Sequence, residues 1–292
     1  MTNQLLILPY GREHYYSLQN KGILVRRKDS NHLWSPSESV IADATGPFCV
    51  YGDSPQMIHL IFVDSDNNLS YATRQKDRWK TYKLSKLNPE IHPEYFRIYP
   101  VCGRLNLLYS VRYSGEILLI HCILGNHAKP HTVDKLDSPH FWIYNSKAYY
   151  TNNQGACGYV DLHDEKPDTF CKLYDDARNI SLYNMDGKEF TLFTRDNKLY
   201  VNNNEIIYDT RMELPAVTCS QGILYVMWKS GGYVRYITSK NQGNTWTSPM
   251  RYMTSGAEIT QYFSEILGNS HLFYGYNTSC DLHLFSRPDI FR

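Results

Sequence analysis

A short apolar pattern recurs along this chain at a nearly constant spacing. An apolar residue, a variable residue, a branched residue or leucine, and a tyrosine follow one another from four starting points: Phe48, Phe96, Phe141 and Ile180. These starting points lie 48, 45 and 39 residues apart. The regular spacing indicates repeated copies of one structural unit, because a unit this small cannot bury its apolar face alone.

A second apolar run follows in each unit, and it sets the number of units. Seven such runs occur from His14 to His271, at a mean interval of roughly 43 residues, which is the size of a four-stranded propeller blade. A third run follows across a connection rich in Gly, Asn, Asp and Ser, which is typical of tight β-hairpins. The pattern predicts an all-β fold, a seven-bladed β-propeller of four-stranded antiparallel blades, with a six-bladed propeller as the alternative.

The aromatic content agrees with this architecture. The 292 residues include 25 Tyr, 11 Phe and 5 Trp, residue types that favour pleated surfaces and fill the wedges between neighbouring blades. We expect a single domain over residues 1–292. Its blades are predicted at 1–44, 45–87, 88–137, 138–176, 177–212, 213–254 and 255–292.

The charge balance argues against one class of partner. The chain has 30 Lys and Arg against 29 Asp and Glu, whereas proteins that bind nucleic acid through bulk charge are clearly basic. Neither a signal-peptide pattern nor an apolar run long enough to span a membrane is present. The seven cysteines lie mostly in apolar, strand-like segments, which is typical of reduced core thiols. These features predict a cytoplasmic protein without bulk nucleic-acid or membrane binding.

One turn motif carries a family resemblance. The segment 239–246 reads SKNQGNTW and resembles the Asp-box of sialidase-like (BNR-repeat) propellers, S-x-D-x-G-x-T-W. The positions of the box are occupied by Ser239, Asn241, Gly243, Thr245 and Trp246. Asp29 and Trp34 occupy matching positions in a second segment, and Trp79 ends a third, shorter one. The resemblance implies a tight turn between third and fourth strands, with Gly243 at positive φ, and it indicates fold rather than activity.

The same resemblance implies one catalytic alternative. Sialidase-like enzymes are expected to hold a substrate carboxylate with three arginines, beside a Tyr–Glu pair and an Asp. The segment 96–100, FRIYP, is close to the arginine signature F/Y-R-I-P, but it has an inserted tyrosine and belongs to the third unit. Our favoured hypothesis is a non-catalytic binding or scaffold propeller that engages a protein or carbohydrate through one face. The alternative is a sialidase-like glycoside hydrolase with an arginine and carboxylate pocket over the central channel.

Propeller ligands usually meet the face formed by the connections from one blade to the next. The longest such connection here is the segment 86–95. Candidate ligand-binding residues on this face are Asp43, Arg97, Arg112, Arg178, Trp228 and Glu258. Glu94 and Asp176 would form the carboxylate pair of a hydrolase, and Tyr95 and Trp228 would offer rings to a sugar.

Three further patterns have structural and functional interpretations. The basic run 26–28 either protects a strand edge or contacts a phosphate or partner. His127 and His131 have the spacing of a metal pair on a helix, but Pro130 favours a solvated loop. The segment 64–68 resembles the start of a calcium loop, yet Leu69 replaces the required glycine and favours a hairpin turn. No nucleotide-binding or metalloprotease motif occurs, so we expect neither metal nor cofactor.

Overall fold

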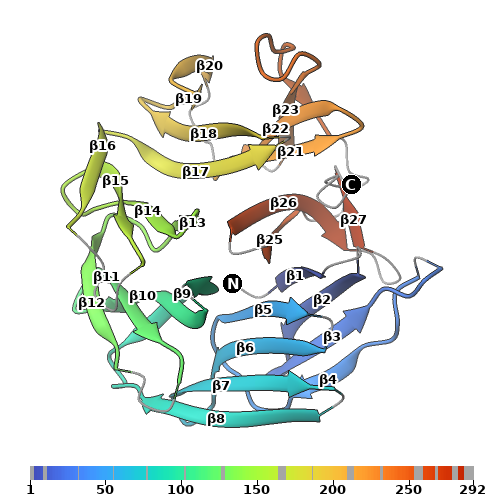
Figure 1. The fold of residues 1–292 in the computed structure, drawn as a ribbon, viewed down its shortest axis with the longest axis vertical. Helices are drawn as coiled ribbons and strands as arrows, with labels where there is room; N and C mark the ends of the chain where they lie inside the picture. Colours follow the sequence, from blue (N-terminus) through green and yellow to red (C-terminus); the bar gives the residue numbers. More distant parts are fainter. Residues whose placement is uncertain are drawn as a thin grey trace.

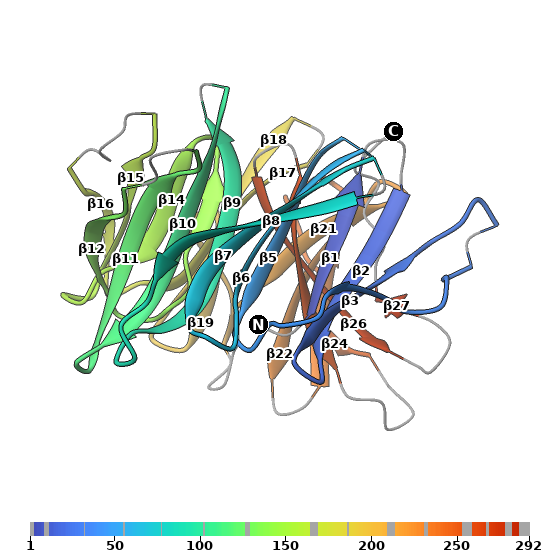
Figure 2. The same cartoon turned by 90° about the horizontal axis from the view of Figure 1, so that it is seen from below.

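A computed structural model gives the fold of most of the chain. It describes residues 3–8, 12–31, 33–54, 56–76, 78–101, 103–125, 129–163, 169–185, 187–208, 214–230, 233–252, 259–266, 269–277 and 282–285. Within these residues the secondary structure consists of strands joined by turns and loops. The strands form six sheets arranged around a central channel, so the protein is an all-β propeller (Figures 1 and 2).

Each blade contains four antiparallel strands that run from the channel outward. The inner strands are β1 (Asn3–Leu8), β5 (Phe48–Ser54), β9 (His92–Val101), β13 (Trp142–Tyr144), β17 (Arg178–Met185) and β21 (Ala216–Ser220). The second strands are β2 (Arg12–Gln19), β6 (Met57–Val63), β10 (Arg104–Tyr113), β14 (Lys147–Thr151), β18 (Lys188–Arg195) and β22 (Ile223–Ser230).

The outer half of each blade completes the sheet. The third strands are β3 (Gly22–Arg27), β7 (Asn68–Gln75), β11 (Glu116–Ile123), β15 (Ala156–Asp161), β19 (Lys198–Val201) and β23 (Tyr233–Ser239). The outermost strands are β4 (Glu38–Ile41), β8 (Arg78–Lys86), β12 (His131–Leu136), β16 (Cys171–Asp175), β20 (Asn204–Tyr208) and β24 (Met250–Arg251).

Two-residue turns join several neighbouring strands. Ser114 and Gly115 between β10 and β11 both have positive φ, as do Asp196 and Asn197 between β18 and β19. Two consecutive positive φ angles define the turn type whose twist matches that of the flanking strands. The turn residues that predicted hairpins in the sequence therefore form them in these places.

The predicted number of blades was wrong: the propeller has six blades, not seven. The last repeat contains only three described strands, β25 (Thr260–Ile266), β26 (Asn269–Asn277) and β27 (Leu282–Leu284). They do not form a sheet of their own, because β25 pairs in parallel with β1 through Gln4 and Phe263 and extends the first sheet to seven strands. The period could not reveal this, since a hairpin buried in a channel needs the same alternation of apolar residues as a blade.

The hairpin of β25 and β26, which we call the central hairpin, lies inside the ring of blades (Figure 1). Strand β25 contacts β1, β5 and β9, and strand β26 contacts β13, β17 and β21. It therefore touches all six inner strands. Its buried hydrophobic residues are Tyr262, Phe263, Leu272, Phe273 and Tyr274, each at most 3% exposed.

Polar contacts fix the central hairpin to the blades. The Oγ of Ser270 accepts a hydrogen bond from the backbone N–H of Ile143 at 3.2 Å, and the Oδ1 of Asn269 accepts one from that of Asn145 at 2.8 Å. The hydroxyl of Tyr274 donates to the carbonyl of Leu214 at 2.5 Å. These bonds satisfy backbone groups that would otherwise be unpaired at the inner edges of the blades.

Candidate functional site

The inner strands define two faces of the propeller. Each inner strand is the first strand of its blade, so all six run in the same direction along the channel. We call the face at which they begin the mouth face, and the face at which they end the far face. On the mouth face, a cavity of about 220 Å³ lies between blades and the central hairpin. It is lined by Asn3, Glu94, Tyr95, His140, Thr260, Gln261 and Phe263.

A buried arginine supports the aromatic wall of this channel-mouth cavity. The Cζ atom of Arg97 lies 3.9 Å from the ring centre of Tyr95 and 4.5 Å from that of Phe263. Arg97 is 1% exposed, and its guanidinium donates to the carbonyl of Phe96 at 2.9 Å and to the Tyr95 hydroxyl. A buried guanidinium that stacks on two aromatic rings fixes the orientation of both rings. Arg97 therefore acts on the cavity through the rings that line it.

The carboxylate of the cavity is also held in place. Glu94 lies in β9 and Arg112 in β10, and their side chains form a two-point ion pair. The Nε of Arg112 donates to Oε1 of Glu94 at 2.8 Å, and its second nitrogen donates to Oε2 at 3.3 Å. Two parallel bonds of this kind give a carboxylate a defined direction. The sequence prediction placed both residues on one face, and the structure brings them together.

His140 adds a neutral imidazole to the cavity. Its ring stands edge-on to Tyr95, with 5.1 Å between the ring centres. Although the residue as a whole is exposed, desolvation of the ring and then the positive charge of Arg97 lower the pKa of His140 to about 4. The imidazole is therefore uncharged near neutral pH, and it offers one donor and one acceptor.

The remaining polar groups come from β1 and the central hairpin. Asn3 lines the cavity, and its Oδ1 accepts a hydrogen bond from the Tyr15 hydroxyl at 2.8 Å. The amide of Gln261 donates to the Tyr274 hydroxyl at 2.9 Å, and Thr260 contributes a hydroxyl. Amide, hydroxyl, imidazole and carboxylate groups thus surround an aromatic wall.

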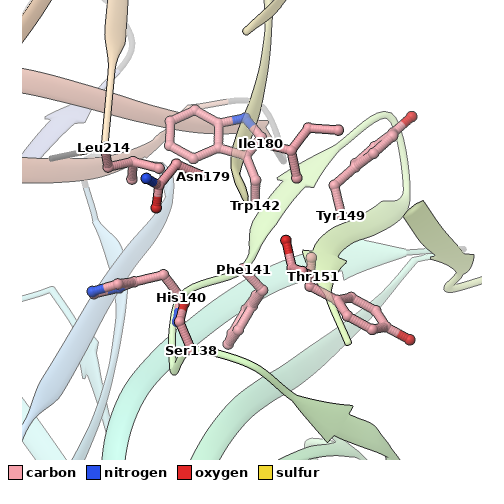
Figure 3. A pocket seen from close by; sticks show the side chains of 10 residues that line it. Ser138, His140, Phe141, Trp142, Tyr149, Thr151, Asn179, Ile180 and Leu214 are labelled. Atoms are coloured by element: carbon pink, nitrogen blue, oxygen red, sulfur yellow. The ribbon is translucent and has the colours of Figure 1, made fainter. Parts of the chain in front are cut away.

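His140 also lines a second, narrower cavity between blades 4 and 5. Figure 3 shows its lining, with the Trp142 ring between Leu214 and Ile180. The interior volume is about 10 Å³, which is close to the space that one water needs. The Trp142 indole donates to the carbonyl of Leu182 at 2.7 Å, which ties these two blades together.

Three predicted residues lie on the mouth face outside the channel-mouth cavity. Asp43 accepts hydrogen bonds from the N–H and hydroxyl of Ser65, at 3.2 and 2.9 Å. Arg178 pairs with Asp137 at 3.3 Å. Asp176, in the turn before β17, has a φ of 55°, and it lines neither cavity.

The predictions for two aromatic residues need correction. Trp228 is 0% exposed and Tyr95 is 1% exposed, so both rings are part of the core and neither presents an open face to a sugar in solution. Glu258 lies outside the described residues. Arg97, Arg112 and Arg178 are bonded to Tyr95, Glu94 and Asp137, so each of the three predicted arginines already has a side-chain partner within the protein.

The turn at 239–246 has well-defined local geometry. The Oδ1 of Asn241 accepts from the backbone N–H of Thr245 at 2.9 Å, and the Oγ of Ser239 accepts from that of Gly243 at 2.8 Å. Gly243 has a φ of +85°, and Trp246 packs against the core. Asp29 caps a similar turn, accepting from Asn31 and Leu33 at 2.9 and 2.8 Å, while Trp34 and Trp79 pack against their blades.

The segments with metal-like spacing form ordinary turns where they are described. Asp64 accepts hydrogen bonds from the backbone of Asp66 and Asn68 at 3.0 and 2.8 Å, as a hairpin turn requires. His131 packs against His121, and His127 lies outside the described residues. Throughout the described part of the chain, no cluster of three His, Cys, Asp or Glu side chains is suited to a metal. No helix in that same part could cross a membrane.

The sequence did not predict five of the seven residues that line the channel-mouth cavity: Asn3, His140, Thr260, Gln261 and Phe263. Thr260, Gln261 and Phe263 belong to the repeat that was predicted to form a seventh blade, which would have placed them on the ring. The described part of that repeat has three strands, one fewer than each of the six blades. His140 stands just before Phe141 at the start of blade 4, and nothing in its local sequence distinguishes it from a loop residue.

The comparisons with known proteins show the fold. No protein-family model and no curated protein matches the sequence. The structure resembles the AfRom2 CNH domain, with 13% identity, a TM-score of 0.58, and coverage of 97% of this chain and 93% of that one. It also resembles a fucose-specific lectin from Aleuria aurantia, with 13% identity, a TM-score of 0.50, and coverage of 95% and 89%.

A third similar structure belongs to an enzyme. It is one of two prolyl endopeptidases, with 8% identity and a TM-score of 0.54, covering 97% of this chain and 50% of that one. None of these three is a sialidase, so the expected kinship with sialidase-like propellers finds no support here. At such low identities the likenesses establish a β-propeller, and the function has to be argued from the site.

Proposed function

We propose that this propeller is a non-catalytic binding protein that takes a carbohydrate unit into the channel-mouth cavity. The observation that carries the proposal is the composition of the cavity wall. Aromatic side chains (Tyr95, Phe263) stand beside a carboxylate (Glu94) whose direction is fixed by Arg112. The Tyr95 and Phe263 rings are only 1% and 3% exposed, so the polar groups of the wall carry the proposal. A sugar ring has many hydroxyls, and the carboxylate, imidazole, amide and hydroxyl groups that line the cavity can form hydrogen bonds with them.

The size and charge of the cavity support the same class of ligand. Drug-sized ligands occupy pockets of about 300–1,000 Å³, and this cavity of about 220 Å³ suits something smaller, such as a single ring. Glu94 offsets one of the two nearby arginine charges, and His140 is neutral. A neutral ligand with many hydroxyls therefore fits better than a strongly charged one.

Hydrolysis has less support than binding. A glycosidase normally flanks the scissile bond with two carboxyl groups, one as acid and one as base or nucleophile. Of the described residues that line the channel-mouth cavity, Glu94 alone carries a carboxylate. Its expected partner, Asp176, lies at the turn before β17, where its N–H donates to the carbonyl of Gly155 at 3.2 Å.

The experiment is a glycan array probed with the full chain, followed by product analysis of any glycan that binds. The proposal predicts selective binding of glycans that share one terminal ring, with the glycan recovered intact. Release of the ring from a bound glycan, or turnover of a fluorogenic sialoside, would establish the hydrolase instead. A folded chain that binds no glycan, but captures a protein through the mouth face, would replace the carbohydrate with a protein partner.

A further inference from the structure

A second set of polar side chains gathers between blades 1 and 2, toward the far face. Arg12, His14 and Tyr16 alternate along β2 and so share one face of blade 1. Arg27 in β3 lies directly opposite His14 and belongs to the same face. That face looks toward blade 2, because Tyr16 packs in one cluster with Leu60.

Blade 2 contributes a further arginine to this place. Arg74 in β7 lies opposite Ile58, and it alternates with Ala72, which packs toward blade 1. The charges of Arg74 and Arg27 act on both His14 and Tyr16. We call Arg12, His14, Tyr16, Arg27 and Arg74 the arginine cluster. The cluster includes Arg27 of the basic run 26–28. The sequence analysis gave that run two interpretations, protection of a strand edge or contact with a phosphate or partner.

Three buried polar atoms of the arginine cluster have no hydrogen-bond partner among the described residues. They are Nδ1 of His14, the hydroxyl of Tyr16 and Nε of Arg27. His14 is 6% exposed and Tyr16 is 0% exposed. Buried polar groups in native proteins nearly always have a partner, which is often a bound ion or water where the protein supplies none. The Arg and Tyr groups donate hydrogen bonds, so the missing partner is an acceptor.

The positive charges of the arginine cluster favour an anion as the acceptor. Arg12, Arg27 and Arg74 bring three positive charges, and Glu38, bonded to Arg27, brings one negative charge. Desolvation, and then the charges of Arg27, Arg74 and Arg12, lower the pKa of His14 to about 4, so its imidazole is neutral. Arginines pair especially well with phosphate oxygens, because the guanidinium offers parallel donors.

We propose that the arginine cluster between blades 1 and 2 is a binding site for a phosphate group, either free or on a phosphomonoester. Its oxygens would accept hydrogen bonds from Tyr16 and Arg27 on the buried side. Arg12, which is exposed, and Arg74, which is half-buried, would neutralise the charge on the outer side. The site is independent of the channel-mouth cavity, since it lies toward the Leu8 end of β1 rather than the Asn3 end.

The experiment is a calorimetric titration of the full chain with inorganic phosphate, with ionic strength held constant by chloride so that general screening does not change. We expect saturable binding of one phosphate. Tyr16→Phe removes a single donor and keeps the ring, and it should weaken binding about tenfold. Arg12→Gln and Arg74→Gln should each weaken it by about tenfold or more. The control Arg104→Gln, an exposed arginine at the far-face end of β10, should bind as the wild type does.

A phosphate response equal to that of added chloride would overturn the proposal, because it would reflect screening alone. Saturable binding that Tyr16→Phe and Arg12→Gln leave unchanged would also overturn it, since the ion would then sit elsewhere. Arg12 is exposed, so this variant is expected to fold. A parallel titration with phosphoserine distinguishes a site open to monoesters from one that encloses the free ion, and binding of either supports the proposal.

Discussion

The guanidinium carbon of Arg97 lies 3.9 Å from the centre of the Tyr95 ring, and the opposite end of the same stack is Phe263 of the central hairpin. This contact joins blade 3 to the hairpin at the place where the channel-mouth cavity opens. The core of the propeller and the shape of its cavity therefore depend on the same side chains.

Replacing Arg97 should test that dependence. Arg97→Lys keeps the charge but loses the planar stack on two rings, and we expect it to destabilise the fold by about 2 kcal/mol. The matched control is Arg251→Lys. The guanidinium carbon of Arg251 lies 5.4 Å from the ring centre of the exposed Tyr233, so this substitution should change the free energy of unfolding by less than about 1 kcal/mol. Urea unfolding measures both, and equal losses would contradict the central role of Arg97.

The central hairpin should contribute strongly to stability because it fills the channel. Phe263 is 3% exposed and contacts the side chains of blade 3. Phe263→Ala should cost about 3–5 kcal/mol, as large-to-small changes in a tight core do. Leu173→Ala, at a site that is 43% exposed, should change the free energy of unfolding by less than about 0.5 kcal/mol. A small effect at Phe263 would mean that the hairpin does not pack in the channel.

Two buried histidines should make the fold sensitive to acid. Desolvation lowers the pKa of His14 and of His271 from 6.5 to about 4 in the folded chain. The unfolded chain therefore binds more protons between these two values, so the stability is fully present above about pH 6.5 and is lost as the pH falls toward 4. Unfolding at pH 7 and pH 5 should differ by about 1–2 kcal/mol per histidine. His271→Gln should reduce that difference, and a stability that does not change with pH would disprove the assignment.

Gly243 should not tolerate a side chain. Its φ is +85°, and an added Cβ would lie 2.9 Å from a ring carbon of Phe190. Gly243→Ala should destabilise the chain by about 1–2 kcal/mol, because both the backbone and the neighbour oppose it. The control is Gly125→Ala. A Cβ added there meets nothing within 4 Å, so this substitution should leave the stability nearly unchanged. Thermal unfolding of the two variants checks the comparison, and equal melting temperatures would refute it.

The sequence predicted the local structure well because the relevant signals are local. Turn residues such as Ser114 and Gly115 determine hairpins within a few positions, and the recurring tyrosines indicate strands that face a neighbouring blade. The predicted face was useful as well, since Glu94 and Arg112 meet there through adjacent strands of one blade.

The errors concern relations between distant parts of the chain. Whether the last repeat forms a blade depends on how many blades are needed to close the ring. Strand β25 of that repeat instead pairs with β1, more than 250 residues away in the sequence. Trp228 looked like a surface residue because its strand ends near a connection, but the neighbouring units bury it. The Arg97 stack likewise combines residues from the third and last repeats, so no local pattern could predict it.

Binding of a carbohydrate in the channel-mouth cavity should depend on the Glu94 carboxylate. The most direct measurement is the dissociation constant of the glycan selected on the array, for the wild type, Glu94→Gln and Glu116→Gln. Glu116 is a suitable control because it forms an exposed ion pair with Lys135 in the same blade, at 2.6 Å, outside the cavity. We predict that Glu94→Gln raises the dissociation constant at least about tenfold while Glu116→Gln leaves it unchanged. Equal dissociation constants for all three proteins would contradict carbohydrate binding through Glu94.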